Sequence, residues 1–271
     1  MAVATLASLL AFGCSAPAST DTGSANDSKT APSGPTGTIR GVVRLNGPAP
    51  SAATEKIAQD QTTCGTTVSL PRIELDKSNA IRNTFVYLDG VAAPAGAPSA
   101  PSTKSVLVDQ KNCQYVPHMM TVPVGSALEI TNSDTILHNV HGYLVAQEGR
   151  DSLFSISQPI RDQHNKTPEL TKPGVVTLTC DAGHPWMNAY VLVAENPYVA
   201  ISNAQGEFVI PNVPPGTYRI RMWHEGVLLR EHNKKLNTYE YEDPYESTQD
   251  VVVNANTDTT VNFDLTLRPA K

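Results

Sequence analysis

TKPGVVTLTCDAGHPWMNAYVLV, residues 171–193, contains two apolar runs rich in β-branched residues, VVTLT and AYVLV. Such runs are typical of β-strands, so the segment predicts two strands joined by a loop. The loop carries Cys180, His184 and Met187. A thiolate, an imidazole and a thioether this close together form a soft ligand set, which favours copper over harder metal ions.

A second histidine for such a site occurs upstream, in TVPVGSALEITNSDTILHNVHGY, residues 121–143. Apolar residues alternate here in VPV and LEI, which is the pattern of a half-buried strand. The stretch contains both His138 and His141. Because residues three positions apart in a strand point to opposite faces, only one of the two can face the metal, and we choose His138.

The rest of the chain shows the same pattern of short strand-forming runs. Short runs of Val, Ile, Thr and Tyr alternate with clusters of Gly, Pro, Asn and Asp over the 271 residues. This pattern predicts an all-β sandwich protein, and the length allows one large or two small domains. The net charge of −6, with no basic stripe to offset it, argues against nucleic acid as a partner.

The upstream stretch VPVGSALEITNSDTILHNVHGYL, residues 122–144, resembles the cupredoxin strand that supplies the first histidine ligand, with its His-Asn-Val step. The loop after Cys180 resembles the ligand loop of amicyanin, which also runs from Cys to His-Pro-aromatic-Met. Here three residues separate Cys180 from His184, one more than in amicyanin. The resemblance implies a cupredoxin Greek-key β-sandwich over residues 105–195.

The same resemblance implies one type 1 (blue) copper ion. Carried over residue by residue, its ligands are His138, Cys180 and His184 in the plane and Met187 on the axis. Asn139 would help to hold the cysteine loop. Such a site transfers single electrons, and the sequence offers no nucleophile pair or paired acids, so we do not expect an enzyme.

In cupredoxins the outer histidine opens onto a small apolar patch that serves as the electron port. The resemblance implies such a patch at His184, Pro185 and Trp186, where a redox protein partner would dock.

Sequence on either side of this region resembles a second family, the carboxypeptidase-regulatory-like domain, a small transthyretin-like sandwich. Its turn pattern D/N-x-x-G-x-F is supplied by Asn203, Gly206 and Phe208, and PPGTY follows at residues 214–218. The resemblance implies a discontinuous outer β-sandwich, residues 37–91 and 196–268, with the copper domain inserted. This layout resembles exported proteins labelled methylamine-utilisation-like.

The N-terminus predicts export. Residues 2–13 form a short apolar run, too short to span a bilayer and placed where the apolar core of a signal peptide lies. Gly13-Cys14 resembles a bacterial lipobox, which implies lipidation of Cys14 and anchoring to the membrane on its periplasmic or outer side. We therefore interpret residues 1–14 as a lipoprotein signal peptide, and the small, polar stretch 15–36 as a disordered tether.

If Cys14 carries lipid, Cys64, Cys113 and Cys180 remain. In an oxidising compartment two of the three should form a disulfide. Cys64 and Cys113 lie in turn-rich sequence, QTTCGTT and DQKNCQY, and we pair them. Cys180 is then the lone thiol, available as a metal ligand.

Two alternatives to electron transfer stay open. The first is copper storage or delivery, which a further site formed by His118 with Met119 and Met120 would suit; His118 could instead support the main site. The second is a carbohydrate- or protein-binding module, with possible glycan contact by the outer domain. Within residues 228–249, three tyrosines could form a binding platform, although a solvated excursion is our preferred interpretation.

Overall fold

The computed structural model describes residues 34–70, 72–91, 105–145, 150–233, 235 and 238–269, together with Met1. The predictions for residues 2–33, including Cys14, lie outside these residues. The all-β prediction is confirmed: α1 (Gln61–Cys64) is the only helix in the described part of the chain. Nowhere in that part is a helix long and apolar enough to cross a membrane.

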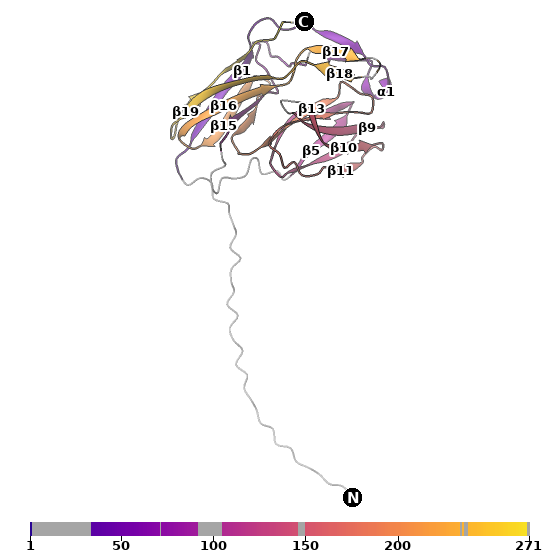
Figure 1. Ribbon diagram of the computed structural model, residues 1–271, viewed down its shortest axis with the longest axis horizontal. Coiled ribbons are helices and arrows are strands. Elements are labelled where there is room, and N and C mark those ends of the chain that lie inside the picture. The colour runs from indigo at the N-terminus through magenta and orange to yellow at the C-terminus, as the bar shows by residue number, and fades with distance from the viewer. Residues whose placement is uncertain are drawn as a thin grey trace.

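Two four-stranded sheets form what we call the outer sandwich, seen with β1, β16 and β19 in Figure 1. The first sheet consists of β15 (Glu207–Val213), β1 (Gly37–Leu45), β20 (Asp258–Thr260) and β21 (Phe263–Leu265). The second has the order β14 (Val199–Ile201), β4 (Phe85–Asp89), β16 (Gly216–His224) and β19 (Tyr245–Val253).

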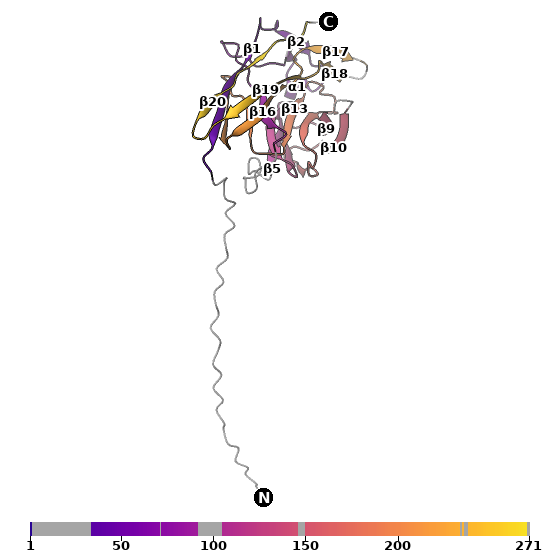
Figure 2. The same ribbon diagram turned by 60° about the vertical axis from the view of Figure 1, so that its left-hand side comes forward.

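Two further sheets form what we call the inner sandwich, which lies beside the outer one in Figures 1 and 2. The five-stranded sheet has the order β10 (Arg150–Gln158), β9 (His138–Val145), β12 (Gly174–Thr179), β13 (Asn188–Ala194) and β7 (Met119–Pro123). The four-stranded sheet has the order β11 (His164–Lys166), β8 (Ala127–Asn132), β5 (Ser105–Lys111) and β6 (Gln114–Val116).

Two hairpins complete the described structure. They are β17 (Leu229–Asn233) with β18 (Thr238–Tyr241), and β2 (Ala53–Lys56) with β3 (Thr67–Leu70). The loop of the second hairpin carries α1, which lies above β13 in both Figure 1 and Figure 2. This hairpin therefore reaches from the outer sandwich over the end of the inner one.

The sequence of β13 is a nearly continuous apolar run because both faces of this strand are buried. Its residues alternate between two cores: Val191 and Val193 face the core of the inner sandwich, whereas Tyr190 and Leu192 face the layer between the sandwiches. Strands covered on both sides read as continuous apolar runs. The layer itself joins the five-stranded sheet to β4 and β16, and its buried members are Phe85, Met119, Val175, Tyr190, Leu192, Ala194 and Trp223.

Apolar burial also organises the outer sandwich. Its core draws on Ile39 and Val43 of β1, Val86 and Leu88 of β4, and strands near the C-terminus.

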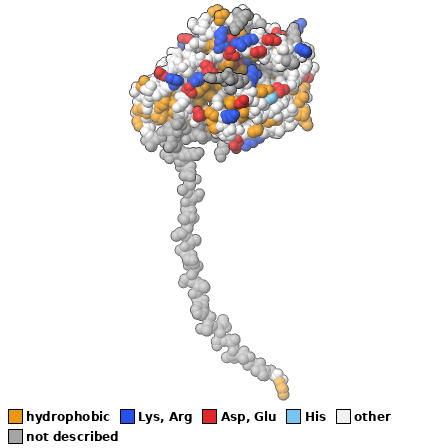
Figure 3. All heavy atoms as spheres, in the orientation of Figure 1, with side chains coloured by type: hydrophobic (Ala, Val, Ile, Leu, Met, Phe, Trp, Pro, Cys, Tyr) orange, Lys and Arg blue, Asp and Glu red, His pale blue; other side chains and the backbone are white. Residues whose placement is uncertain are grey.

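The domain boundaries at 37–91, 105–195 and 196–268 stay a prediction. On the face shown in Figure 3, acidic and basic side chains are interspersed with scattered apolar ones.

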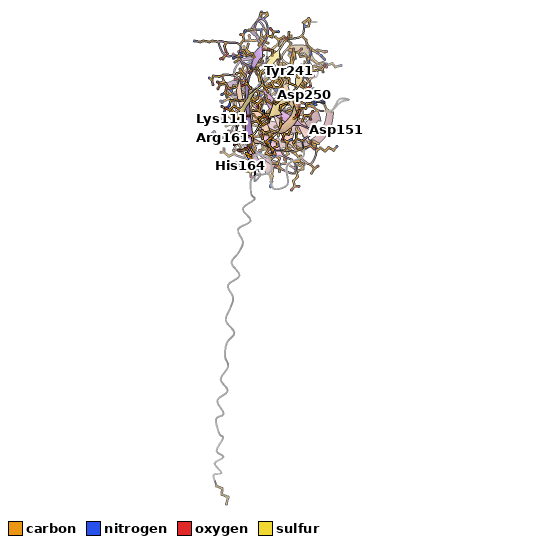
Figure 4. The ribbon with its side chains drawn as sticks, turned by 90° about the vertical axis from the view of Figure 1, so that its left-hand side faces the viewer. Lys111, Asp151, Arg161, His164, Tyr241 and Asp250 are labelled. Carbon is orange, nitrogen blue, oxygen red and sulfur yellow. A yellow bond between two sulfur atoms is a disulfide. The ribbon has the colours of Figure 1, made fainter. Side chains whose placement is uncertain are left out.

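The interpretation of residues 228–249 as a solvated excursion is wrong for two of its tyrosines. Tyr245 is buried in the outer core, and the Arg72 guanidinium lies 3.2 Å from the centre of the Tyr241 ring. Figure 4 shows Tyr241 at the end of the body opposite His164.

Candidate metal centre

Three of the predicted ligands converge inside the inner sandwich. Cys180 Sγ lies 4.0 Å from His138 Nδ1 and 3.6 Å from His184 Nδ1. The ligand atoms of the three residues all lie within 4.8 Å of one another, and all three side chains are buried. One sulfur and two nitrogen donors thus point at a single small volume.

Neighbouring strands bring these residues together. His138 begins β9, and Cys180 directly follows β12, which pairs with β9 in antiparallel fashion. The chain then turns back to β13 through the loop that holds His184. Met187 ends this loop: its amide donates to the carbonyl of His184 over 2.9 Å, and its side chain is buried in the same core as Cys180.

Each histidine is held from behind by a carboxylate. His138 Nε2 lies 2.9 Å from Asp134 Oδ2, and His184 Nε2 lies 3.0 Å from Asp60 Oδ2. When Nε2–H donates to the carboxylate, Nδ1 keeps its lone pair, and this lone pair faces Cys180. Histidine ligands of metal ions are usually fixed in this way, so the donor set fits a metal ion.

Sequence reasoning missed the roles of both aspartates. Asp134 lies four residues before His138 and also accepts hydrogen bonds from the amides of Asn112 and Cys113, at 2.8 and 2.9 Å. The spacing of only four residues between Asp134 and His138 could have indicated that the two side chains interact. Asp60 lies 124 residues from His184, and nothing in the sequence links the two.

Burial sets the protonation of the donors. It raises the pKa of the Cys180 thiol, although the backbone amide of Asn139, 3.5 Å from Sγ, favours the thiolate. Burial also lowers the pKa of His138, against the pull of Asp134. Without a metal ion the site therefore favours a thiol beside a neutral imidazole, and a cation that binds there must displace the thiol proton.

Asn139 supports the cysteine through its backbone only. Its side-chain amide donates instead to Ser155 and Ser157 of β10, at 3.1 and 3.3 Å. The expectation that Asn139 helps to hold the cysteine loop stays a prediction, and its backbone amide, 3.5 Å from Cys180 Sγ, is the contact that would do so. His141 points away from the cluster, as the strand period requires: its ring contacts Asp181 at 2.6 Å and Ser152 at 2.8 Å.

The expectation that His184 reaches the surface is also wrong, because the side chain has 0% exposure. The covering segment, which we call the cap, is the loop of the β2–β3 hairpin, residues 57–66. Asp60 of the cap lies over His184, and the side chain of Gln59 donates to the carbonyl of Ala182 over 2.9 Å. Pro185 and Trp186, the other members of the predicted patch, are partly exposed.

The predicted disulfide between Cys64 and Cys113 is confirmed. It joins the end of α1 to the turn between β5 and β6. Two other groupings of possible metal ligands among the described residues include one or both of these cysteines, but their sulfurs are bonded to each other. The cluster at Cys180 is the grouping with a free thiol.

His118 belongs to a different cluster. Its Nε2 contacts Glu225 Oε1, and Arg72 Nε lies 3.1 Å from Glu225 Oε2. This charged group lines a cleft of about 330 Å³ that also reaches Trp186 and Met187. A site formed by His118 with Met119 and Met120 is not what the structure shows, because the two methionines are buried in different cores on opposite faces of β7.

Comparisons with known proteins give two kinds of likeness. Residues 174–266 match the family model of the carboxypeptidase regulatory-like domain. This match begins in β12, upstream of the boundary expected at residue 196. No curated protein matches the chain.

Solved structures with similarity to the chain include an amicyanin, a cupredoxin and a copper-containing nitrite reductase. A reduced amicyanin variant is 26% identical, over 37% of this chain and 95% of that chain, with a TM-score of 0.28. A purple cupredoxin from Nitrosopumilus maritimus is 22% identical over 33% and 98%, with a TM-score of 0.28. The copper-containing nitrite reductase from Thermus scotoductus SA-01 is 23% identical over 39% of this chain, which spans 25% of that protein, also with a TM-score of 0.28.

Proposed function

We propose that this protein binds one copper ion at His138, Cys180 and His184, with Met187 as a fourth, weaker ligand, and transfers single electrons. The observation that carries the proposal is the convergence of two imidazole Nδ1 atoms on one buried thiol, at 4.0 and 3.6 Å. Two imidazoles and a thiolate with a weak thioether form the ligand set of blue-copper electron-transfer sites.

A copper ion bound there would supply the one-electron redox chemistry. The chain's own residues keep the donors in place: Asp134 and Asp60 fix the two rings, and the amide of Asn139 lies beside the sulfur. The ligands come from two paired strands and the loop between β12 and β13, so the scaffold resists rearrangement when the charge of the site changes. A rigid, buried ligand set with little water around it suits electron transfer, because little has to move.

The absorption spectrum of the full chain after addition of Cu(II) tests this function. We expect an intense band at about 600 nm, where thiolate-to-copper charge transfer falls in sites of this type. His138→Ala should lose or strongly weaken the band, because it removes one ligand. His141→Ala, on the same strand but the opposite face, is the matched control and should keep it.

Bound Cu(II) without this band would contradict the proposed site, and Cu(I) binding without colour would favour storage or delivery. A band that survives His138→Ala but not His141→Ala would show that the wrong histidine was chosen.

Two parts of the proposal concern surroundings of the site. The partner is a redox protein that docks on the partly exposed Pro185 and Trp186. The ring of Trp186 lies 5.4 Å from that of His184, centre to centre, so it offers a path past the buried histidine. Lipid anchoring through Cys14, on the periplasmic or outer side of a membrane, rests on the lipobox-like Gly13-Cys14 alone.

A further inference from the structure

The feature that the ligand set does not explain is the cap, residues 57–66. It belongs to the β2–β3 hairpin, far from the copper ligands in sequence, and it is closed on itself. The amide of Ile57 donates to the carbonyl of Thr66 over 3.0 Å, and the amides of Thr63 and Cys64 donate to that of Asp60, both over 2.9 Å. Hydrogen bonds within the cap therefore give it a defined structure of its own.

The cap is joined to the ligand loop at separate points. Asp60 Oδ2 lies 3.0 Å from His184 Nε2, and Gln59 donates to the carbonyl of Ala182 over 2.9 Å. Gly183 lies directly beneath Gln59, where a Cβ would be 2.3 Å from the Gln59 amide nitrogen. Gly183 also has a positive φ of 89°, a backbone conformation that favours glycine at this point of the loop.

A covalent bond holds the far end of the cap. The disulfide ties Cys64 to Cys113, and the carbonyl of Cys113 accepts a hydrogen bond from the indole of Trp186 over 3.1 Å. The cap and the ligand loop thus share one anchor, which keeps Asp60 over His184 even though Asp60 itself lies at the surface.

We infer that Asp60 is a positioning residue of the copper site and that the cap closes the site over His184. This inference rests on the proposed function. It adds that the cap controls the access of small molecules to the site and the reduction potential of the copper ion. A carboxylate behind a ligating imidazole makes the ring a stronger donor, and its negative charge stabilises the more highly charged Cu(II) state relative to Cu(I). Cys180 is buried next to His184, its Sγ 3.6 Å from His184 Nδ1, so we expect small molecules to reach it more readily when the cap opens.

The first test uses the metal-free full chain, and reads alkylation of Cys180 by iodoacetamide in the peptide that contains it. Asp60→Ala removes the charge-assisted hydrogen bond that holds the cap, so we expect alkylation to be faster by about tenfold. Asp250→Ala, an exposed carboxylate on β19 of the outer sandwich, is the control and should match the unmodified protein. If Asp60→Ala and Asp250→Ala are alkylated at the same rate, the cap does not limit access to the site, and this part of the inference is wrong.

The second test measures the reduction potential of the copper-loaded protein. Asp60→Asn keeps the size of the side chain and an oxygen that can accept the hydrogen bond, but removes the charge. We expect a higher potential than in the unmodified protein, whereas Asp250→Asn should leave it unchanged. A purely structural role for Asp60 would not move the potential of the Asn variant, so an unchanged value would overturn the positioning role.

The two tests separate this inference from the proposed function. If the protein binds no copper, the proposed function and the positioning role fail together, while the alkylation rates still decide whether the cap limits access to the site. If copper binds with the expected band but both Asp60 variants behave like their controls, the proposed function stands and the inference fails.

Discussion

Cys180→Ser is expected to abolish the intense visible band of the copper-loaded protein completely. The band arises from charge transfer between a thiolate and copper, and a serine hydroxyl at the same place lacks the soft sulfur that the transition needs and is far harder to deprotonate than a thiol. The substitution changes one buried atom of similar size, so the fold should survive. Absorption and circular dichroism spectra of the same samples would measure both effects.

The matched control for this change is Cys14→Ser. Cys14 lies outside the described residues and is predicted to carry lipid, so its loss should leave the band unchanged. Cys64 and Cys113 cannot serve as controls, because their sulfurs form the disulfide. A band that persists in Cys180→Ser, or disappears in Cys14→Ser, would contradict the assignment of Cys180 as the copper thiolate.

Glu225→Gln is expected to destabilise the fold by about 3–5 kcal/mol at neutral pH, the cost of breaking a buried ion pair by removing one partner. The Glu225 carboxylate is buried between Arg72 and His118, and also accepts a hydrogen bond from Asn188 over 3.1 Å. A neutral amide leaves the buried guanidinium of Arg72 without its counter-charge. The free energy of unfolding from urea denaturation would measure the loss.

Glu246→Gln is the matched control. Glu246 is an exposed residue of β19 that pairs with Arg221, and Arg221 keeps a second partner in Asp89 at 2.6 Å. Exposed pairs of this kind contribute up to about 1 kcal/mol. If Glu225→Gln costs no more than Glu246→Gln, the buried group does not stabilise the fold.

The pH dependence of stability follows from the same group. Burial alone would raise the pKa of Glu225, but the charges of Arg72 and His118 outweigh it and lower the pKa to about 2. Because the folded pKa lies below the ordinary value of 4.5, the stabilisation is complete above that value and is lost as the pH falls towards 2. This contribution is about 3 kcal/mol, so the stability difference between the unmodified protein and Glu225→Gln should shrink over that range.

His118 contributes in the opposite direction. Burial alone would lower its pKa, but the Glu225 carboxylate reverses this and the pKa is raised above the ordinary value of 6.5. Its contribution is therefore complete below pH 6.5 and is lost as the pH rises through the folded pKa. The group as a whole stabilises the contact between the two sandwiches most in the mildly acidic range.

The sequence by itself determined the features that depend on local order. Three of the candidate ligands, Cys180, His184 and Met187, lie on one loop whose flanking strands are visible as apolar runs, so the approach of His184 to Cys180 needs only one turn of the chain. The period of a strand implied that only one of His138 and His141 faces the metal, and we chose His138; cysteine parity and turn-rich sequence led us to pair Cys64 with Cys113. Both agree with where the structure places these residues.

Only the tertiary structure decided which groups surround those ligands. Asp60 meets His184 across 124 residues of sequence, and Glu225 meets His118 across 107. No periodicity or spacing connects such pairs, because the first contact depends on how the β2–β3 hairpin lies over the end of the inner sandwich and the second on how the two sandwiches pack against each other. The expected surface position of His184 failed for this reason: exposure is a property of what packs on a residue, and the cap is encoded far from the loop that it covers.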